Sequence, residues 1–243
     1  MSGWIPDAAL MTPEPMPLAV LYEDADLLVV DKPAGMVVHP AYRHLSGTLL
    51  NGILWYGRAW PRGSRPSIVG RLDKMTSGIV VVAKRAAMHR ELQHALGAPD
   101  ASKEYLALVA GAVDVGRGAI DLPLRRDPAN RTRVVVAADG ARSMTRFTCA
   151  ASGPSVSLLR CRLVTGRMHQ IRAHLAARGW PIVGDPIYGP RAGTAPSFPR
   201  QALHAHRVAL THPVTGERLQ MQAPVPEDMR ALLSVCGLSV PER

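Results

Sequence analysis

The sequence predicts an α+β fold, in which a mixed, mainly antiparallel β-sheet carries a few flanking helices. Segments of β-branched or alternating apolar residues outnumber segments with helical apolar spacing. Short turns rich in Gly, Asn or Pro separate many of the neighbouring strand segments, so these segments can pair antiparallel. A chain of 243 residues, 47% of them hydrophobic, is large enough for one domain, or for two lobes that share a core.

The first third of the chain predicts a tail, two strands, a helix and a further strand. Residues 1–17 contain four prolines and are expected to form a flexible N-terminal tail. Residues 18–24 (LAVLYED) and 26–33 (DLLVVDKP) are expected to be strands on either side of an acidic turn. A helical apolar pattern occupies residues 48–60, and the β-branched run 79–84 (IVVVAK) is typical of a buried strand.

The remainder alternates two helices with several strands. Residues 85–100 have apolar positions at helical spacing, and Gly97 and Pro99 end the pattern. Residues 165–179 (TGRMHQIRAHLAARG) predict a second helix with Met168, Ile171 and Leu175 on its apolar side. The other segments are expected to be strands, the last of them a hairpin: 103–111, 133–137, 144–150, 155–164 and 206–224.

The charge distribution indicates a polyanionic partner. The net charge is +10, and the basic residues are 25 arginines and 4 lysines. This arginine excess can reflect genome composition or phosphate recognition by planar guanidinium groups. Residues 125–172 hold ten arginines against two acids, a net charge of +8, whereas a solvated surface normally mixes signs. No basic amphipathic helix or long apolar span is present, so nucleic acid is favoured over a membrane.

Several classes of chemistry lack their sequence signatures. The three cysteines have no paired metal-ligand spacing, and the nine histidines have no acidic partner at zincin spacing, so no metal site is predicted. Walker, dinucleotide-binding and Gly-x-Ser-x-Gly motifs are absent from the sequence. The scattered cysteines and the lack of a signal-peptide pattern predict the reducing cytoplasm.

One short stretch, VGRLDKMTSGIVVVAK (residues 69–84), contains an acidic residue in basic surroundings. Asp73 lies between Arg71 and Lys74, just before Thr-Ser-Gly and an apolar run. Taken alone, such an aspartate is more often a turn residue than a catalyst. However, the following hydroxyl and backbone groups can fix the carboxylate at the mouth of a strand. An ionised carboxylate beside guanidinium groups is also a competent nucleophile.

Five segments, in order along the chain, resemble motifs of the RluA family of RNA pseudouridine synthases. GRLDKMTSG resembles the central motif of that family, His-Arg-Leu-Asp-x-x-Thr-Ser-Gly. The other four segments extend the resemblance from about residue 18 to residue 229: LYEDADLLVVDKPAGMVVHP, SKEYLALVAG, TGRMHQIRAHLAARGWPIVGDPIYG and LHAHRVALTHPVTGERLQMQAPVPEDM. The resemblance implies the pseudouridine synthase fold with a central active-site cleft, a catalytic domain at residues 18–230 and a C-terminal extension at 231–243.

The resemblance also implies roles for individual residues. Asp73 matches the catalytic aspartate, and Arg172 matches the basic residue that pairs with it. Tyr105 matches the tyrosine that packs against the target uracil and assists proton removal; such stacking contributes about 1–3 kcal/mol per base. RNA contacts are expected from Arg71, which helps displace the flipped base, and from Arg167, His169 and Gln170.

Residue-level chemistry leaves some alternatives open. On a helix, His169 and Arg172 would share a face, so that a guanidinium could point towards a carboxylate. Without the other motifs, Tyr105 is more simply a core residue and Arg172 a phosphate contact. The sequence also departs from the family at Gly70, where His is usual. In addition, only about 17 residues precede the first expected strand. The separate N-terminal RNA-binding domain of many relatives is therefore expected to be missing, and RNA recognition is expected from the Arg125 to Arg172 region.

The resulting prediction is an enzyme that isomerises uridines to pseudouridine in structured RNA. The expected partner is an rRNA or tRNA stem-loop, without membrane or DNA, and the default expectation is a monomer that needs no cofactor and no metal. A non-catalytic RNA-binding or ribosome-assembly factor is the alternative, and a metal-dependent hydrolase is a further rival. The target uridine is left open, as is whether Asp73 attacks the ribose, attacks the base or abstracts a proton.

Overall fold

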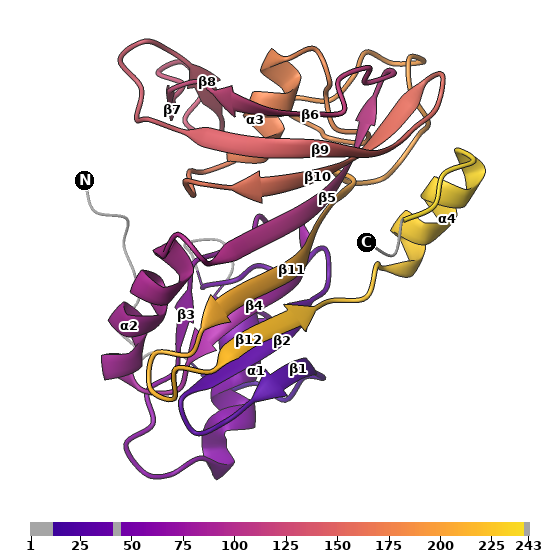
Figure 1. The fold of residues 1–243 in the computed structure, drawn as a ribbon. Coiled ribbons are helices and arrows are strands. Elements are labelled where there is room, and N and C mark those ends of the chain that lie inside the picture. Colours follow the sequence, from indigo (N-terminus) through magenta and orange to yellow (C-terminus); the bar gives the residue numbers. More distant parts are fainter. Residues whose placement is uncertain (1–11, 41–44, 241–243) are drawn as a thin grey trace. The chain divides into compact units, whose positions relative to one another are not determined.

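The fold was analysed in a computed structural model that describes residues 12–40 and 45–240 (Figure 1). Most of the expected N-terminal tail therefore lies outside the described residues, as do residues 241–243. The chain divides into two compact units, each built from two stretches of sequence. The first unit comprises Met1–Ala101 and Arg207–Ala223, and the second comprises Ser102–His206 and Pro224–Arg243. Mainly antiparallel strands and four described α-helices confirm the α+β prediction.

The first unit is a sheet with a helix packed on each face. Its strand order is β1-β2-β4-β11, with β3 also paired to β4 and β12 to β11. The β1–β2, β2–β4, β3–β4 and β11–β12 pairs are antiparallel. The strand bounds are β1 Ala19–Glu23, β2 Leu27–Lys32, β3 Ser67–Val69, β4 Ser77–Ala83, β11 Leu203–Thr211 and β12 Arg218–Gln222. Strand β11 begins in the second unit and ends in the first.

Alternation along the central strands sends apolar side chains to both faces of this sheet. Leu28 and Val30 of β2 pack in a cluster with helix α1 (Leu49–Tyr56), which Thr48 caps. Leu27 and Val29 pack in a second cluster with helix α2 (Ala86–Gly97). A strand buried on both faces needs a continuous apolar run, which explains why β4 reads Ile-Val-Val-Val.

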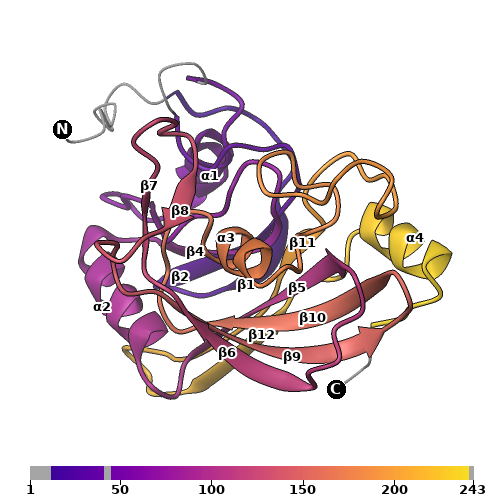
Figure 2. The same ribbon diagram turned by 90° about the horizontal axis from the view of Figure 1, so that it is seen from above.

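The second unit contains an antiparallel sheet of order β5-β10-β9-β6 and a separate two-stranded sheet, β7–β8. The strand bounds are β5 Ser102–Ala110, β6 Arg117–Asp121, β7 Leu124–Arg126, β8 Val134–Val136, β9 Met144–Ser152 and β10 Val156–Leu163. Helix α3 (Gln170–Ala177) lies against the larger sheet (Figure 2). Its Ile171 and Leu175 share a buried cluster with Phe147 and Cys161.

The structure corrects the start of one expected helix and adds a helix that was not predicted. The helix expected at residues 165–179 begins only at Gln170, because His169 adopts a left-handed backbone conformation (φ 52°) that a right-handed helix cannot contain. Helix α4 (Glu227–Val235), which was not predicted, crosses the expected domain end at residue 230. Its Met229, Leu232 and Leu233 belong to the core of the second unit. Among the described residues, no helix is long and apolar enough to cross a membrane.

Candidate active site

Asp73 lies in the loop between β3 and β4 of the first unit. The side chain of Asp73 is half-buried, whereas Arg71 and Lys74 on either side are exposed. The Thr76 N–H donates to the backbone oxygen of Asp73 at 3.1 Å, and Thr76 itself is buried. Gly70 opens the loop with a φ of 83°, in the left-handed region that favours glycine. This backbone conformation gives a physical reason for glycine where the family usually has His.

A buried lysine fixes the chain directly after Asp73. Lys32 is fully buried at the end of β2. Its Nζ donates to three backbone oxygens: Pro33 at 2.8 Å, Met36 at 3.0 Å and Lys74 at 3.2 Å. The Gly35 N–H donates to the same Lys74 oxygen at 2.9 Å. Burying an ammonium group is costly unless its donors are used, so these bonds hold the Asp-Lys-Pro-x-Gly segment and the Asp73 loop in one arrangement.

A histidine that sequence analysis did not assign contributes to the electrostatics of this loop. His39 is partly buried. Burial lowers the pKa of His39, and the positive charge of Arg71 and the nearby His89 lower it further. The imidazole is therefore neutral at pH 7, which leaves Arg71 as the cation of this pair.

Tyr105 lies on β5 in the second unit and is half-buried. It stands opposite Cys161 of β10, on the face of the sheet that α3 covers. Lys103 is two residues earlier on the same strand and therefore on the same face. Burial lowers the pKa of Lys103. Sequence analysis did not select this lysine, although its spacing from Tyr105 would have placed both on one face.

Arg172 on α3 forms a buried ion pair with Asp185. Its Nε lies 2.7 Å from Asp185 Oδ2, and its Nη2 lies 2.9 Å from Oδ1. Burial alone raises the pKa of Asp185, but the hydrogen bonds and charge of Arg172, together with the backbone N–H groups of Tyr188 and Ile187, lower the pKa overall. The two parallel bonds fix the plane of the guanidinium. The expected pairing of Arg172 with Asp73 joins residues of different units and stays a prediction.

The Tyr188 hydroxyl connects this ion pair to the small β7–β8 sheet. It accepts from the Val134 N–H at 2.8 Å and donates to the Val134 oxygen at 3.1 Å. His169 Nδ1 lies 3.2 Å from the same hydroxyl, and the Arg172 guanidinium lies 5.3 Å from the centre of the Tyr188 ring. The Gly-Asp-Pro-Ile-Tyr-Gly segment therefore orients Arg172 and anchors β8 at the same time.

Gln170 uses its whole side-chain amide inside the protein. Its Oε1 accepts from the Arg167 N–H at 3.0 Å and from the Thr165 hydroxyl at 2.8 Å. Its Nε2 donates to the Met144 oxygen at 2.9 Å and to the Thr145 hydroxyl at 3.0 Å. Gln170 is buried, whereas Arg167 is exposed. The amide thus folds the loop that presents Arg167, although sequence analysis expected Gln170 itself to contact RNA.

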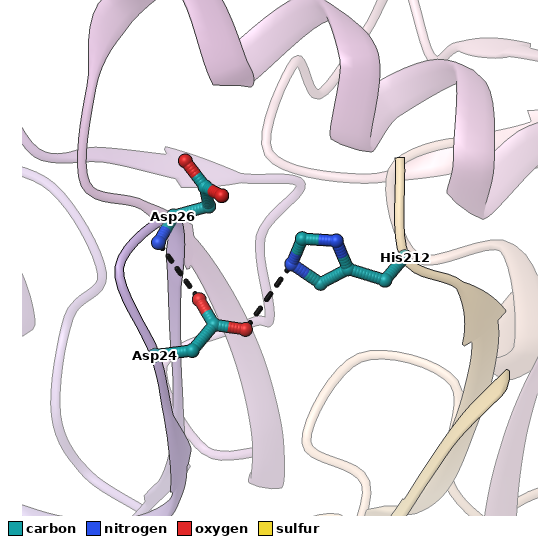
Figure 3. Close-up of side chains that lie close together, drawn as sticks. All are labelled: Asp24, Asp26 and His212. Carbon is teal, nitrogen blue, oxygen red and sulfur yellow. Dashed lines mark hydrogen bonds and ion pairs between the residues drawn. The ribbon is translucent and has the colours of Figure 1, made fainter. Parts of the chain in front are cut away.

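A group of Asp24, Asp26 and His212 in the first unit has the composition of a metal site (Figure 3). His212 Nδ1 accepts from two backbone N–H groups at 3.1 Å, so the ring proton of neutral His212 is on Nε2. That Nε2 lies 3.1 Å from Asp24 Oδ2, and Asp24 Oδ1 accepts the Asp26 N–H at 2.7 Å. A protonated Nε2 is not a metal ligand, so the geometry favours a polar contact between Asp24 and His212 over a metal site.

Comparison with known proteins identifies the class. The sequence profile described as RNA pseudouridylate synthase matches residues 26–177. "Uncharacterized RNA pseudouridine synthase YlyB" of Bacillus subtilis is 43% identical over 231 residues, which cover 94% of this chain and 76% of the relative. "Ribosomal large subunit pseudouridine synthase D" is 43% identical in Xanthomonas campestris (91% and 70% covered) and 38% identical in Escherichia coli O6:H1 (95% and 74% covered).

Two solved human structures share the fold. "RNA Pseudouridylate Synthase Domain Containing 4" has a TM-score of 0.74 and 23% identity, and covers 92% of this chain and 95% of its own. "RNA Pseudouridylate Synthase Domain Containing 1" has a TM-score of 0.68 and 26% identity, and covers 87% of this chain and 86% of its own.

The fold and these relatives define an RNA-modifying isomerase. The chain belongs to the RluA family of RNA pseudouridine synthases, which isomerise uridine to pseudouridine in RNA. The resemblance seen in the five motifs is thereby confirmed, together with the enzyme class and RNA as the partner. Neither the fold nor the relatives favour the non-catalytic alternative.

Proposed function

We propose that this chain isomerises uridines in the RNA of the large ribosomal subunit, with Asp73 as its catalytic residue. The names of several relatives support the choice of substrate. The observation that carries the assignment of Asp73 is the Lys32 anchor, which immobilises the residue directly after the carboxylate. The cysteines are free thiols, and we place the protein in the cytoplasm as a monomer.

The reaction is an isomerisation whose atoms and electrons balance within the nucleotide. The bond from uracil N1 to ribose C1′ breaks, and a bond from uracil C5 to C1′ forms. The C5 hydrogen leaves as a proton and N1 gains one, so nothing is oxidised and no group is imported. Attack by Asp73 on C1′, attack on the base and abstraction of a ribose proton all require an anionic oxygen held at a fixed position.

The other site residues are assigned supporting roles. Tyr105 gives the extruded uracil a surface for stacking, which offsets part of the cost of flipping. Arg172 pairs with the Asp73 carboxylate while Asp185 keeps the guanidinium oriented. Arg71, Arg167 and His169 contact the RNA. Gln170, with its amide engaged inside the protein, acts as a positioning residue for the loop that carries Arg167.

The assignment of Asp73 is tested by Asp73→Asn, which preserves shape and removes the anionic oxygen. Release of tritium from RNA labelled at uracil C5 measures turnover directly, because C5 loses its hydrogen in the reaction. We expect turnover to fall at least about 10³-fold while RNA affinity stays within a few-fold. The matched control is Asp114→Asn, at an exposed loop position of the second unit, with unchanged turnover.

Full turnover by Asp73→Asn contradicts the assignment. A loss of RNA affinity as large as the loss of turnover also contradicts it, because Asp73 would then act in binding. Large-subunit RNA and transfer RNA are offered in parallel, and turnover confined to transfer RNA refutes the proposed substrate while leaving the role of Asp73 intact.

A further inference from the structure

The sheet of the second unit carries an exposed cluster of arginines. Strands β6, β9, β10 and β5 lie side by side in that order (Figure 1). Directly opposite residues of antiparallel strands share a face. Thr148 of β9 stands opposite Arg117 on one neighbour and Arg160 on the other, and Arg146 stands opposite Arg162. These registers place four guanidinium groups on one face, which we call the arginine face: Arg117, Arg146, Arg160 and Arg162.

The arginine face is the reverse of the face that carries Tyr105. Side chains alternate along a strand, so Phe147 and Cys161 point to the opposite side from their arginine neighbours. Both are buried in the cluster that includes Ile171 and Leu175 of α3. Tyr105 is the direct partner of Cys161. An RNA segment stacked on Tyr105 is therefore separated from the arginine face by the thickness of the sheet.

Basic residues outnumber acidic residues on this face. Arg117, Arg146 and Arg162 are exposed. Like charges placed directly opposite one another destabilise a strand pair, and Arg146 and Arg162 have this relationship. Arg160 is largely buried, with Nη1 lying 3.7 Å from Glu104 Oε1. Among the described residues of these four strands, the acids on this face are Glu104 and Asp121.

The surface is hollowed where the arginines gather. An open groove of about 440 Å³ runs over β5, β10 and β9 and is lined by the Arg146, Arg160 and Arg162 residues, with Thr148 between them and Glu104 at one side. Guanidinium groups bind phosphate oxygens bidentately, and a threonine hydroxyl adds a further donor. Phosphates seated here would lie within reach of both Arg146 and Arg162.

We propose that the arginine face binds the sugar–phosphate backbone of an RNA segment other than the one that holds the target uridine. The proposal rests on RNA being the substrate, as set out above. RNA fits better than an acidic protein because the groove offers guanidinium and hydroxyl donors, which suit a row of phosphates. The sheet separates this face from Tyr105, so only an RNA long enough to pass around its edge reaches both faces. The face thus favours large folded RNA over an isolated stem-loop.

The test removes the three exposed arginines and measures how RNA affinity depends on salt. The variant is Arg117→Gln/Arg146→Gln/Arg162→Gln, prepared with Asp73→Asn so that the RNA is not converted during the titration. Two RNAs are used: a large-subunit fragment of several helices and a single stem-loop with the target uridine. The control, Arg90→Gln/Arg218→Gln/Arg230→Gln with Asp73→Asn, removes equal charge from exposed positions elsewhere.

For the long RNA, the slope of log affinity against log salt should become shallower by about 2 to 2.7 units, since each lost phosphate contact contributes about 0.7–0.9. Near 0.15 M salt this corresponds to roughly 50- to 170-fold weaker binding, if the non-electrostatic part of the binding free energy is unchanged. The control triple should lose far less RNA affinity, and both variants should keep the far-ultraviolet circular dichroism spectrum of the folded protein.

Three outcomes overturn the proposal. An unchanged slope on the long RNA does so and leaves an acidic protein as the ligand to consider. An equal loss of affinity for the long RNA in the control triple shows only a general effect of net charge. If the arginine-face variant loses as much affinity for the isolated stem-loop as for the long RNA, these arginines belong to the target-uridine site. Turnover by the wild-type chain on the same long RNA is measured separately, so failure of the proposed function is distinguished from failure of the arginine face.

Discussion

Replacement of Lys32 by Met tests whether a buried ammonium group holds the loop that carries Asp73. Methionine keeps a similar length and removes the three N–H donors. The backbone oxygens of Pro33 and Met36 lose the Lys32 donor, whereas the Lys74 oxygen keeps the bond from Gly35. A buried acceptor left without a partner costs about 1–3 kcal/mol. Relief from burying a charge offsets part of this, so we expect a loss of about 2–5 kcal/mol in the free energy of unfolding.

The matched control is Lys84→Met, a second buried lysine of the same unit. Lys84 Nζ contacts Glu23 at 2.8 Å and the Asp24 oxygen at 2.7 Å, and none of its described bonds involves the Asp73 loop. Urea unfolding should show that both variants are destabilised. Tritium release, measured where both proteins remain folded, should fall about tenfold or more for Lys32→Met only, because a small displacement of the proposed catalytic carboxylate is costly. Wild-type stability and turnover in Lys32→Met would refute the reasoning, as would equal losses of turnover in the two variants.

Three further predictions follow from local geometry. Gly70→Ala should lower stability by about 1–2 kcal/mol because φ is positive there, whereas Gly116→Ala, with open space and no positive φ, should be neutral in the same unfolding assay. The lowered pKa of Asp185 means that its contribution to stability is present above about pH 4 and is lost as the pH falls through its folded-state pKa. Asp185→Asn should therefore flatten the acid limb of the melting-temperature profile, and an unchanged limb would count against the ion pair. Tyr188→Phe should speed hydrogen exchange at the Val134 amide, and unchanged exchange would show that β8 is anchored elsewhere.

Most of the fold follows from local patterns, and the exceptions have physical causes. The doubly buried β4 was predicted because its environment demands a continuous apolar run. The three-residue strand β3 is too short to show a period. Helix α4 has a start signal that was overlooked: Pro226 is followed by two acidic residues, with Met229, Leu232 and Leu233 at helical spacing.

The start of α3 could not be predicted from local sequence. The residues before Gln170 are compatible with a helix. However, the loop that they form is held by the hydrogen bonds of Gln170 to Met144 and Thr145, some 25 residues away in sequence. Only the tertiary structure supplies these partners, and they leave His169 in its left-handed conformation.

In the candidate site, too, some features could be predicted from the sequence and others could not. Asp73, Tyr105 and Arg172 were proposed from motifs, since side-chain identity carries the chemistry that the motifs imply. The role of Lys32 was invisible because its acceptors are backbone oxygens, which any residue supplies, and one of them is 42 positions away. The bidentate partner of Arg172 is 13 positions further along the chain, and a spacing of that length has no fixed geometry.

The account depends most directly on the carboxylate at position 73 remaking the link between uracil and ribose. Pseudouridines should be mapped in the large-subunit RNA of a strain that lacks this gene and is complemented with either the wild-type chain or Asp73→Asn. The account predicts that positions lost on deletion return with the wild-type chain and stay as uridine with the variant. Return of the modification with Asp73→Asn, at comparable protein levels, would contradict it.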